Sequence, residues 1–126
     1  MKFGIPCSGI YKIENKKTGL VYIGLSVDIF SRFSQHYSNM KMNKHSSPKL
    51  SDDLSIYGIE SFTFEVLEYV SKTKLRLEYK SRLDGNKFEL KLFEKFFKLY
   101  LLQLEKKWMS KYSINNCYNK NNKSFK

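Results

Sequence analysis

The chain has 126 residues and a mass of 15.0 kDa, close to the commonest domain size, so we predict one domain with one hydrophobic core. Lysine and arginine number 23 against 12 aspartate and glutamate residues, and the formal net charge of +11 favours a polyanionic partner, most commonly nucleic acid. An AT-rich genome, which favours lysine codons, would also produce such a charge, so charge alone does not decide the function.

Several other classes of protein are disfavoured. The longest apolar run, LYLLQL, is too short to span a bilayer, and MKFGIPCSG lacks the apolar core of a signal peptide. We therefore expect a cytoplasmic protein that is neither secreted nor held in a membrane. Cys7 and Cys117 form no Cys-x-x-Cys pair and lie near neither His36 nor His45 in sequence, which argues against a zinc site.

The first two predicted strands form a β-hairpin. Residues 9–14 (GIYKIE) and 20–25 (LVYIGL) carry β-branched and aromatic residues on either side of the turn-forming KKTG. Side chains at near-adjacent positions of antiparallel strands lie within reach of each other. The pattern therefore predicts that Tyr11 and Tyr22 lie on adjacent strands of one surface.

A helix is predicted after this hairpin, because apolar residues then recur at spacings of three and four. Ser26 or Asp28 is its predicted N-cap. Arg32 and His36 are four residues apart and share one face of this helix.

A second, short helix is predicted over residues 48–57, with Ser47 as its cap, Pro48 in its first turn and Gly58 as its end. The segment FTFEVLEYV, residues 62–70, has the composition of a third strand.

The following segment alternates between apolar and polar residues on both sides of Asp84-Gly85-Asn86, a strong turn signal, and predicts a second hairpin over residues 72–92. A charged, continuous helix is the competing interpretation. A long helix is predicted from Phe93 to about Tyr112, and the polar tail from about residue 115 is expected to fray after Asn119.

The predicted strands and helices indicate the α+β class. The chain also resembles the GIY-YIG nuclease family in a specific set of residues. Gly9-Ile10-Tyr11 and Tyr22-Ile23-Gly24 are ten residues apart, and they are followed in order by Arg32, His36, Glu105 in a Glu-x-x-Trp sequence, and Asn119. The family resemblance implies a small antiparallel sheet flanked by helices. We therefore interpret residues 1–126 as a single GIY-YIG-like nuclease domain with a three-stranded core and an inserted element around residues 72–92.

The resemblance implies hydrolysis of DNA phosphodiester bonds with one divalent metal ion, Mg²⁺ or Mn²⁺, and no small-molecule cofactor. Glu105 would hold the metal, with water and substrate oxygens completing its shell. Tyr11 would be the general base, which requires that nearby positive charge shift the pKa of its phenol from about 10.

The remaining matched residues have implied roles as well. Arg32 would clamp the scissile phosphate, and Tyr22 would hydrogen-bond the phosphate or a metal-bound water. His36 would relay a proton, as a histidine one helical turn after the arginine does in some restriction enzymes of the family. Asn119 would anchor the site or the nearby backbone.

Some assignments have competitors. Glu94 also lies beside phenylalanines, but it lacks the tryptophan that follows Glu105. Asn115 and Asn116 compete with Asn119. A tyrosine in a strand usually only packs, and His36 alone would be a surface histidine, so the assignments depend on the motif as a whole.

Contacts with DNA are predicted for basic residues near the hairpin and in the insertion, which could otherwise mediate formation of a homodimer. The predicted DNA-binding residues are Lys12, Lys16, Lys17, His45, Arg76, Lys80 and Arg82. A stand-alone endonuclease of a mobile element, phage, virus or restriction system is the favoured function. A structure-specific repair nuclease that needs a partner, and a nucleic-acid-binding module without catalysis, are the alternatives.

Overall fold

The computed structural model describes residues 7–83, 85 and 87–119. Its centre is a three-stranded antiparallel sheet with the strand order β2-β1-β3, so the first strand lies in the middle. The predicted hairpin and third strand are confirmed, and their bounds are Ser8–Asn15 for β1, Val21–Ser26 for β2 and Phe62–Val70 for β3.

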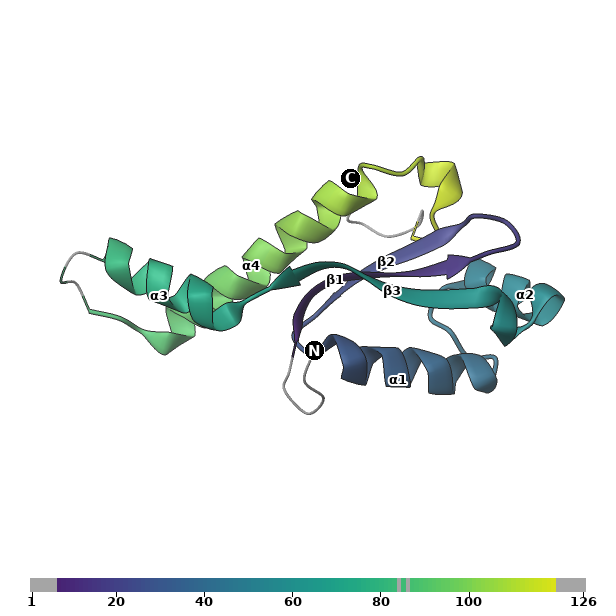
Figure 1. Cartoon of the computed structure of the whole chain (residues 1–126), viewed down its shortest axis with the longest axis horizontal. Coiled ribbons are helices and arrows are strands. Elements are labelled where there is room, and N and C mark those ends of the chain that lie inside the picture. Colours follow the sequence, from purple (N-terminus) through teal and green to yellow (C-terminus); the bar gives the residue numbers. More distant parts are fainter. Residues whose placement is uncertain (1–6, 84, 86, 120–126) are drawn as a thin grey trace.

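In the described part of the chain, four α-helices accompany the sheet, which confirms the α+β class (Figure 1). The two short 3₁₀ helices are Ile59–Ser61 and Ile114–Asn116. No helix of the described residues is long and apolar enough to cross a membrane. The α-helices are α1 (Ile29–Lys41), α2 (Pro48–Tyr57), α3 (Lys72–Arg82) and α4 (Leu90–Met109).

Side-chain caps determine where the first two helices begin. Asp28, one of the two predicted caps, accepts a hydrogen bond from the Ser31 N–H at 3.3 Å, so α1 begins at Ile29. Ser47 caps α2 by accepting from the Leu50 N–H at 3.4 Å, as predicted.

The helices cover opposite faces of the sheet (Figure 1). Alternation along β1 directs Tyr11 and Ile13 to the face covered by α1, and Ile10 to the face covered by the C-terminal half of α4. Tyr22 lies on the same face as Tyr11, in contact with the first of these two cores. The sequence prediction that both phenols share one surface is therefore confirmed.

The glycines of the two tripeptides make room for close contacts. A side chain at Gly9 would place its Cβ 2.0 Å from the Glu68 carbonyl oxygen, and the backbone of Gly9 has a φ of +154°. A Cβ at Gly24, which is paired with Tyr11 across the hairpin, would lie 2.4 Å from the Tyr11 ring. Close packing between neighbouring strands therefore requires a glycine at both positions.

The predicted second hairpin over residues 72–92 is wrong, because α3 and the start of α4 occupy this region. Its lysine, leucine, arginine and glutamate residues are good helix formers, and Ser71 caps α3 by accepting from the Lys74 N–H. Leu75 and Tyr79, four residues apart, face α4. The long helix also begins three residues earlier than predicted and ends at Met109. Asp84 and Asn86 of the predicted turn lie outside the described residues.

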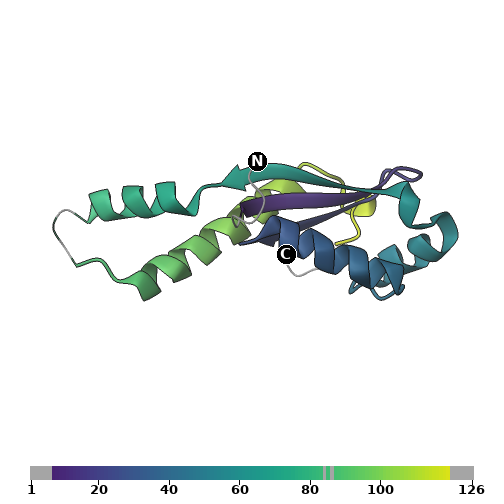
Figure 2. The same cartoon turned by 60° about the horizontal axis from the view of Figure 1, so that its bottom comes forward.

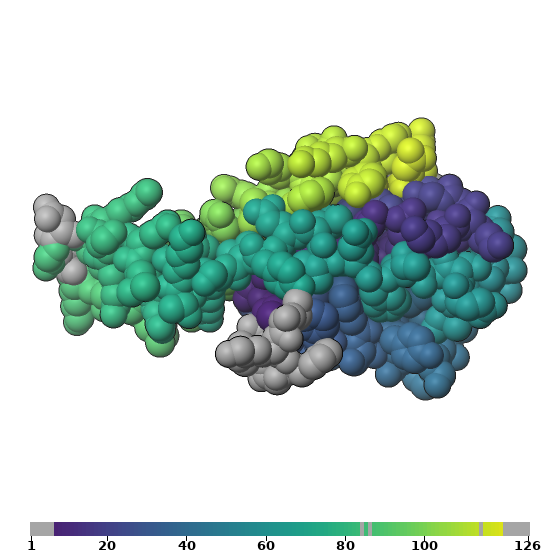
Figure 3. Space-filling view, viewed as in Figure 1, coloured from purple at the N-terminus to yellow at the C-terminus, as the bar shows by residue number. Residues whose placement is uncertain are grey.

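Together, α3 and the first half of α4 form a helical arm that projects from the sheet (Figures 1 and 2). The space-filling view shows this arm as a narrow lobe beside the body of the domain (Figure 3). Leu75 and Tyr79 pack against Phe93 and Phe97, so the arm has an apolar interior of its own.

The residues before Asn119 do not form a loose polar tail. Cys117 pairs with Val21 in a parallel bridge, and the Tyr118 N–H donates to the Val21 carbonyl at 2.7 Å. Cys117, Tyr118 and Asn119 are buried against the free edge of β2. The fraying predicted after Asn119 falls on residues outside the described part of the chain.

Candidate active site

The Tyr11 hydroxyl is the first member of a hydrogen-bonded chain in the face covered by α1. It lies 2.8 Å from His36 Nε2, and His36 Nδ1 lies 3.0 Å from His45 Nε2. The last hydrogen bond of this series is donated by the backbone N–H of Ser47 to His45 Nδ1 at 3.0 Å. His45, one of the predicted DNA-binding residues, lies in a loop, and its ring is stacked on that of His36.

The Ser47 amide determines the direction of this chain, because an amide nitrogen can only donate. In neutral His45 the proton is therefore on Nε2, from where it is donated to His36 Nδ1. In neutral His36 the proton is then on Nε2, from where it is donated to the Tyr11 oxygen. The Tyr11 proton is left to point away from His36, so neutral His36 cannot take it up directly.

Both imidazoles are neutral at pH 7. Burial, with smaller contributions from His45 and Arg32, lowers the pKa of His36 to about 4. Burial likewise lowers the pKa of His45 to about 4. The directed chain described above is therefore the resting state of the site.

We expect the stability of the domain to fall as the pH is lowered from about 6.5 to 4. In this window the unfolded chain binds protons at both histidines, whereas the folded chain keeps them neutral, so acid favours unfolding. Urea unfolding at several pH values measures this slope. A His36→Gln/His45→Gln variant removes the two groups, and an equal slope in that variant would rule out the histidines as its source.

The environment of Tyr11 opposes ionisation of its phenol. Burial is the main cause of the raised pKa, and the charge of Glu105 and the neighbouring Tyr22 raise it further, while Arg32 lowers it. The protein groups together therefore keep Tyr11 protonated at neutral pH. Arg32 shifts the pKa in the predicted direction, but burial outweighs its effect.

Tyr22 packs against the two histidines. Its ring centroid lies 5.5 Å from that of His36 and 5.0 Å from that of His45, in edge-to-face geometry. Burial raises the pKa of Tyr22, a hydrogen bond with Ser46 lowers it, and the charge of Glu105 raises it. Tyr22 is therefore a second neutral phenol in the same cluster.

Arg32 and Glu105 reach this cluster from opposite faces of the sheet. Arg32 is exposed on α1, one turn before His36, and its charge acts on both tyrosines. Glu105 lies on α4, which packs mainly against the edge strand β2, and only 8% of its surface is exposed. The structure thus brings together the five predicted residues Tyr11, Tyr22, Arg32, His36 and Glu105.

The donor set fits a metal ion that binds few protein ligands. Among the described residues, no group of three or more histidine, cysteine, aspartate or glutamate side chains is arranged to hold a metal. Glu105 offers a hard carboxylate oxygen close enough to Tyr11 and Tyr22 for its charge to act on both phenols. Mg²⁺ suits such a site, because it usually retains several waters and binds one or two carboxylates together with phosphate oxygens.

Asn119 holds the backbone of the second tripeptide. Its Oδ1 accepts from the Ile23 N–H at 2.8 Å, and its Nδ2 donates to the Ile23 carbonyl at 2.7 Å. Both bonds are buried, so Asn119 pairs with β2 as a neighbouring strand would. Its competitors Asn115 and Asn116 are exposed.

A buried polar cluster that the sequence analysis missed holds this C-terminal segment in place. The Tyr118 hydroxyl donates to Asp53 Oδ2 at 2.8 Å and accepts from Asn15 Nδ2 at 3.2 Å. Burial raises the pKa of Tyr118 to about 12, so the phenol keeps the proton that it donates. The cluster joins α2, β1 and the segment that carries Asn119.

We expect Tyr118→Phe to destabilise the domain by about 1–3 kcal/mol, because it leaves the buried carboxylate of Asp53 and the amide of Asn15 without this partner. Thermal unfolding measures the effect. Tyr57→Phe is the matched control, since Tyr57 is 37% exposed. Equal stability of the Tyr118 and Tyr57 variants would contradict the proposed importance of the cluster.

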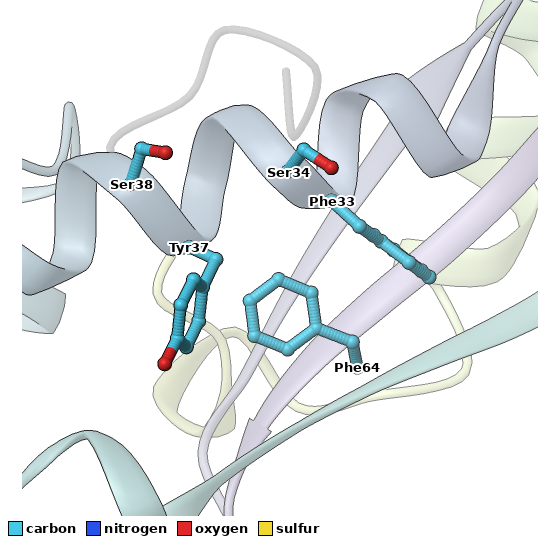
Figure 4. Close-up of a pocket in the computed structure, with 5 residues that line it drawn as sticks. All are labelled: Phe33, Ser34, Tyr37, Ser38 and Phe64. Atoms are coloured by element: carbon cyan, nitrogen blue, oxygen red, sulfur yellow. The ribbon is translucent and has the colours of Figure 1, made fainter.

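Two phenylalanine rings pack next to the Tyr11 ring. Phe33 contacts it edge-on with a centroid distance of 5.4 Å, and Phe64 contacts Phe33 at 5.1 Å. Figure 4 shows Phe33 and Tyr37 of α1 around an open depression, with Phe64 of β3 opposite them. The depression therefore borders the aromatic residues that pack against Tyr11.

The remaining predicted residues are scattered. Glu94, the competitor of Glu105, is paired with Lys72 in the arm at 2.8 Å. Lys12 points to the opposite face from Tyr11 and forms ion pairs with Glu14 and Glu65, which makes it a poor candidate for binding a phosphate at this site. The other predicted DNA-binding lysines and arginines are exposed, Lys16 and Lys17 in the β1–β2 turn and Arg76, Lys80 and Arg82 on α3.

Comparison with known proteins agrees with this arrangement. The sequence is 33% identical over 67 residues to Intron-associated endonuclease 1 of Enterobacteria phage T4, an alignment that covers 53% of this chain and 27% of the phage protein. The structure of the catalytic domain of the homing endonuclease I-TevI has the same fold, with a TM-score of 0.58, 24% identity and coverage of 88% of this chain and 95% of that one. The profile of the GIY-YIG catalytic domain matches residues 7–119, a range that includes every member of the cluster, and the chain therefore belongs to the GIY-YIG family.

Proposed function

We propose that this protein is a metal-dependent DNA endonuclease that hydrolyses phosphodiester bonds at the Tyr11 cluster. The observation that carries the proposal is the convergence of two phenols, a guanidinium and a carboxylate from four separate elements on one site. Membership of the family and the names of the two relatives, an intron-associated endonuclease and a homing endonuclease, support DNA as the substrate.

Tyr11 is the proposed general base. Its oxygen accepts a hydrogen bond from His36, and the chain to the Ser47 amide keeps that donor in place, so a phenolate at Tyr11 would be stabilised. Glu105 would hold a divalent ion, whose positive charge would lower the pKa of the neighbouring phenol and help to neutralise the phosphate. With its own proton released to solvent, Tyr11 would then accept a proton from the attacking water.

His36 and His45 are positioning residues in this mechanism. They orient the Tyr11 oxygen and donate to it, but they do not carry its proton away. This differs from the relay that the resemblance implied, and it follows from the direction that the Ser47 amide gives to the chain.

Arg32 is the proposed phosphate clamp. It is exposed next to the buried cluster, where its rigid guanidinium can bind two phosphate oxygens and stabilise the charge that develops in the transition state. Tyr22 keeps its proton and can donate a hydrogen bond to the phosphate. Asn119 supports the site by holding the backbone of Ile23.

Cleavage of supercoiled plasmid tests this proposal. We expect purified protein to cut in Mg²⁺ or Mn²⁺, to stop in EDTA, and to lose at least 100-fold in rate with Glu105→Ala. Glu94→Ala is the matched control on the same helix, because Glu94 is paired with Lys72 in the arm. The ratio of nicked to linear product reports whether one site acts at a time or a dimer cuts both strands.

Two outcomes would contradict the proposal. A wild-type protein that binds DNA but does not cut in either metal would favour the non-catalytic binding module or the nuclease that needs a partner. Full activity of Glu105→Ala would rule out Glu105 as the metal ligand.

A further inference from the structure

The helical arm is held together by a cluster of aromatic side chains between its two helices. Tyr79 of α3 contacts the rings of Phe93 and Phe96 of α4, each with a centroid distance of 5.6 Å, and Phe88 from the connecting loop covers the end of this cluster. The two helices lie side by side in both views, running in opposite directions (Figures 1 and 2). The arm can therefore present side chains at fixed positions.

The arm carries a large excess of positive charge. Residues 72–98 contain nine lysine and arginine residues against four aspartate and glutamate residues. Lys72 and Glu94 form an ion pair at 2.8 Å, and no other ion pair is found between described residues of the arm. Most basic side chains in the described part of the arm therefore have no described carboxylate within ion-pair distance.

This charge is concentrated on one side of the arm. Successive residues of a right-handed helix are rotated by about 100° around its axis. When two such helices lie antiparallel, the residue that follows an inward-facing residue therefore points to the same side of the pair in both helices. Leu75, Tyr79, Phe93 and Phe97 face inward. The four residues that follow them are exposed, and three of the four are basic, namely Arg76, Lys80 and Lys98. The fourth, Glu94, is paired with Lys72.

The opposite side of the arm has a different character. The residues that precede inward-facing positions turn to this side, and they include Glu78, Leu92 and Phe96 with a single lysine, Lys74. These four positions carry no net charge, whereas three of the four positions on the other side are basic.

The basic side is also the side of α4 that carries Glu105. Residues seven apart on a helix return to within about 20° of the same direction. Lys98 and Lys91 precede Glu105 by seven and fourteen residues, which corresponds to about 10 and 21 Å along the axis. We call Arg76, Lys80, Lys91 and Lys98 the basic face of the arm.

We propose that the basic face binds the phosphate backbone of a DNA duplex beyond the cleaved phosphate and so aligns the duplex with the catalytic cluster. The inference rests on the proposed nuclease function, because α4 carries both Glu105 and half of the basic face. A duplex presents phosphates along its full length, which matches a row of cations that extends about 20 Å from the site. A second copy of this chain would present the same positive charge and be repelled.

Fluorescence anisotropy with a 30-base-pair duplex in EDTA, which prevents cutting, tests the proposal. We expect Arg76→Gln/Lys98→Gln to weaken binding about tenfold at 0.15 M salt, and to reduce the slope of log Kd against log salt by about two, irrespective of DNA sequence. The matched control is Lys74→Gln/Lys107→Gln, which removes the same charge from exposed positions outside the basic face. Circular dichroism verifies that both variants fold.

Equal effects of the two double variants would overturn the proposal, because they would indicate that only net charge matters. An unchanged slope in the Arg76/Lys98 variant would also overturn it, and a concurrent change of oligomeric state would assign the face to self-association. Failure of the nuclease function is measured separately, as the absence of metal-dependent cutting by the wild-type protein, and it does not affect the binding measurement in EDTA.

Discussion

Tyr11→Phe should abolish cleavage while leaving the fold and DNA binding intact. The substitution retains the ring that packs against Gly24 and Phe33, and it removes the hydroxyl that accepts from His36 and is proposed to activate water. Loss of a general base reduces rates by about 10²–10⁴. Single-turnover cleavage of plasmid DNA in Mg²⁺ measures the effect, with Kd determined in parallel in EDTA.

Tyr37→Phe is the matched control for this prediction. Tyr37 lies on α1, the helix that covers the same face of the sheet as Tyr11. It lines the aromatic depression, and 48% of its surface is exposed. Its hydroxyl can be removed without disturbing the chain from Tyr11 to Ser47. If Tyr11→Phe cut at more than a tenth of the wild-type rate, a base other than Tyr11 would have to activate the water.

Gly24→Ala should inactivate the enzyme through a single methyl group. The new Cβ would lie 2.4 Å from the Tyr11 ring, so the ring or β2 must move, and Tyr11 would lose its alignment with His36. Overpacking of a core typically costs about 1–3 kcal/mol, and a displaced general base costs activity as well. Chemical denaturation and single-turnover cleavage measure the two effects.

Gly19→Ala separates this clash from the general effect of replacing a glycine. Gly19 lies in the β1–β2 turn with a φ of +80°, and an added Cβ there meets no atom within 4 Å. We expect a loss of about 1 kcal/mol from backbone strain, with the cleavage rate unchanged. Similar activities of the two alanine variants would show that Tyr11 tolerates displacement.

The sequence predicted the sheet and the first two helices well because their signals are local. The hairpin has alternating β-branched and aromatic residues around a turn, and α1 and α2 begin at Asp28 and Ser47, side chains that cap the helices next to them. The motif residues were likewise recognisable by their order and spacing, and Tyr11, Tyr22, Arg32, His36 and Glu105 do converge.

The helical arm was mistaken for a hairpin because two periodicities coincided. Leu75, Leu77 and Tyr79 alternate as in a strand, but Leu75 and Tyr79 are also one helical turn apart, and only these two pack against α4 while Leu77 is 63% exposed. The surface that the segment packs against decides between a strand and a helix, and here that surface is α4, which contacts residues one helical turn apart. Tertiary packing therefore selects the helix, and the local sequence alone does not.

The proton arrangement of the site could not be predicted from sequence either. It depends on a backbone amide, that of Ser47, and on the loop that brings His45 onto His36. A backbone donor has no signature in the sequence. The same is true of the Tyr118–Asp53 contact, which joins residues 65 positions apart.

The pairing of Asn119 with Ile23 has a consequence for biosynthesis. The tyrosines leave the ribosome early, whereas Glu105 and the segment that closes the edge of β2 are made almost a hundred residues later. A nascent chain that stops short of residue 105 lacks the carboxylate proposed to hold the metal, and one that stops before residue 119 lacks the amide that pairs with the second tripeptide. Synthesis therefore completes the site only once residue 119 has been made, and chains that stop before this point lack part of the centre that would cut DNA.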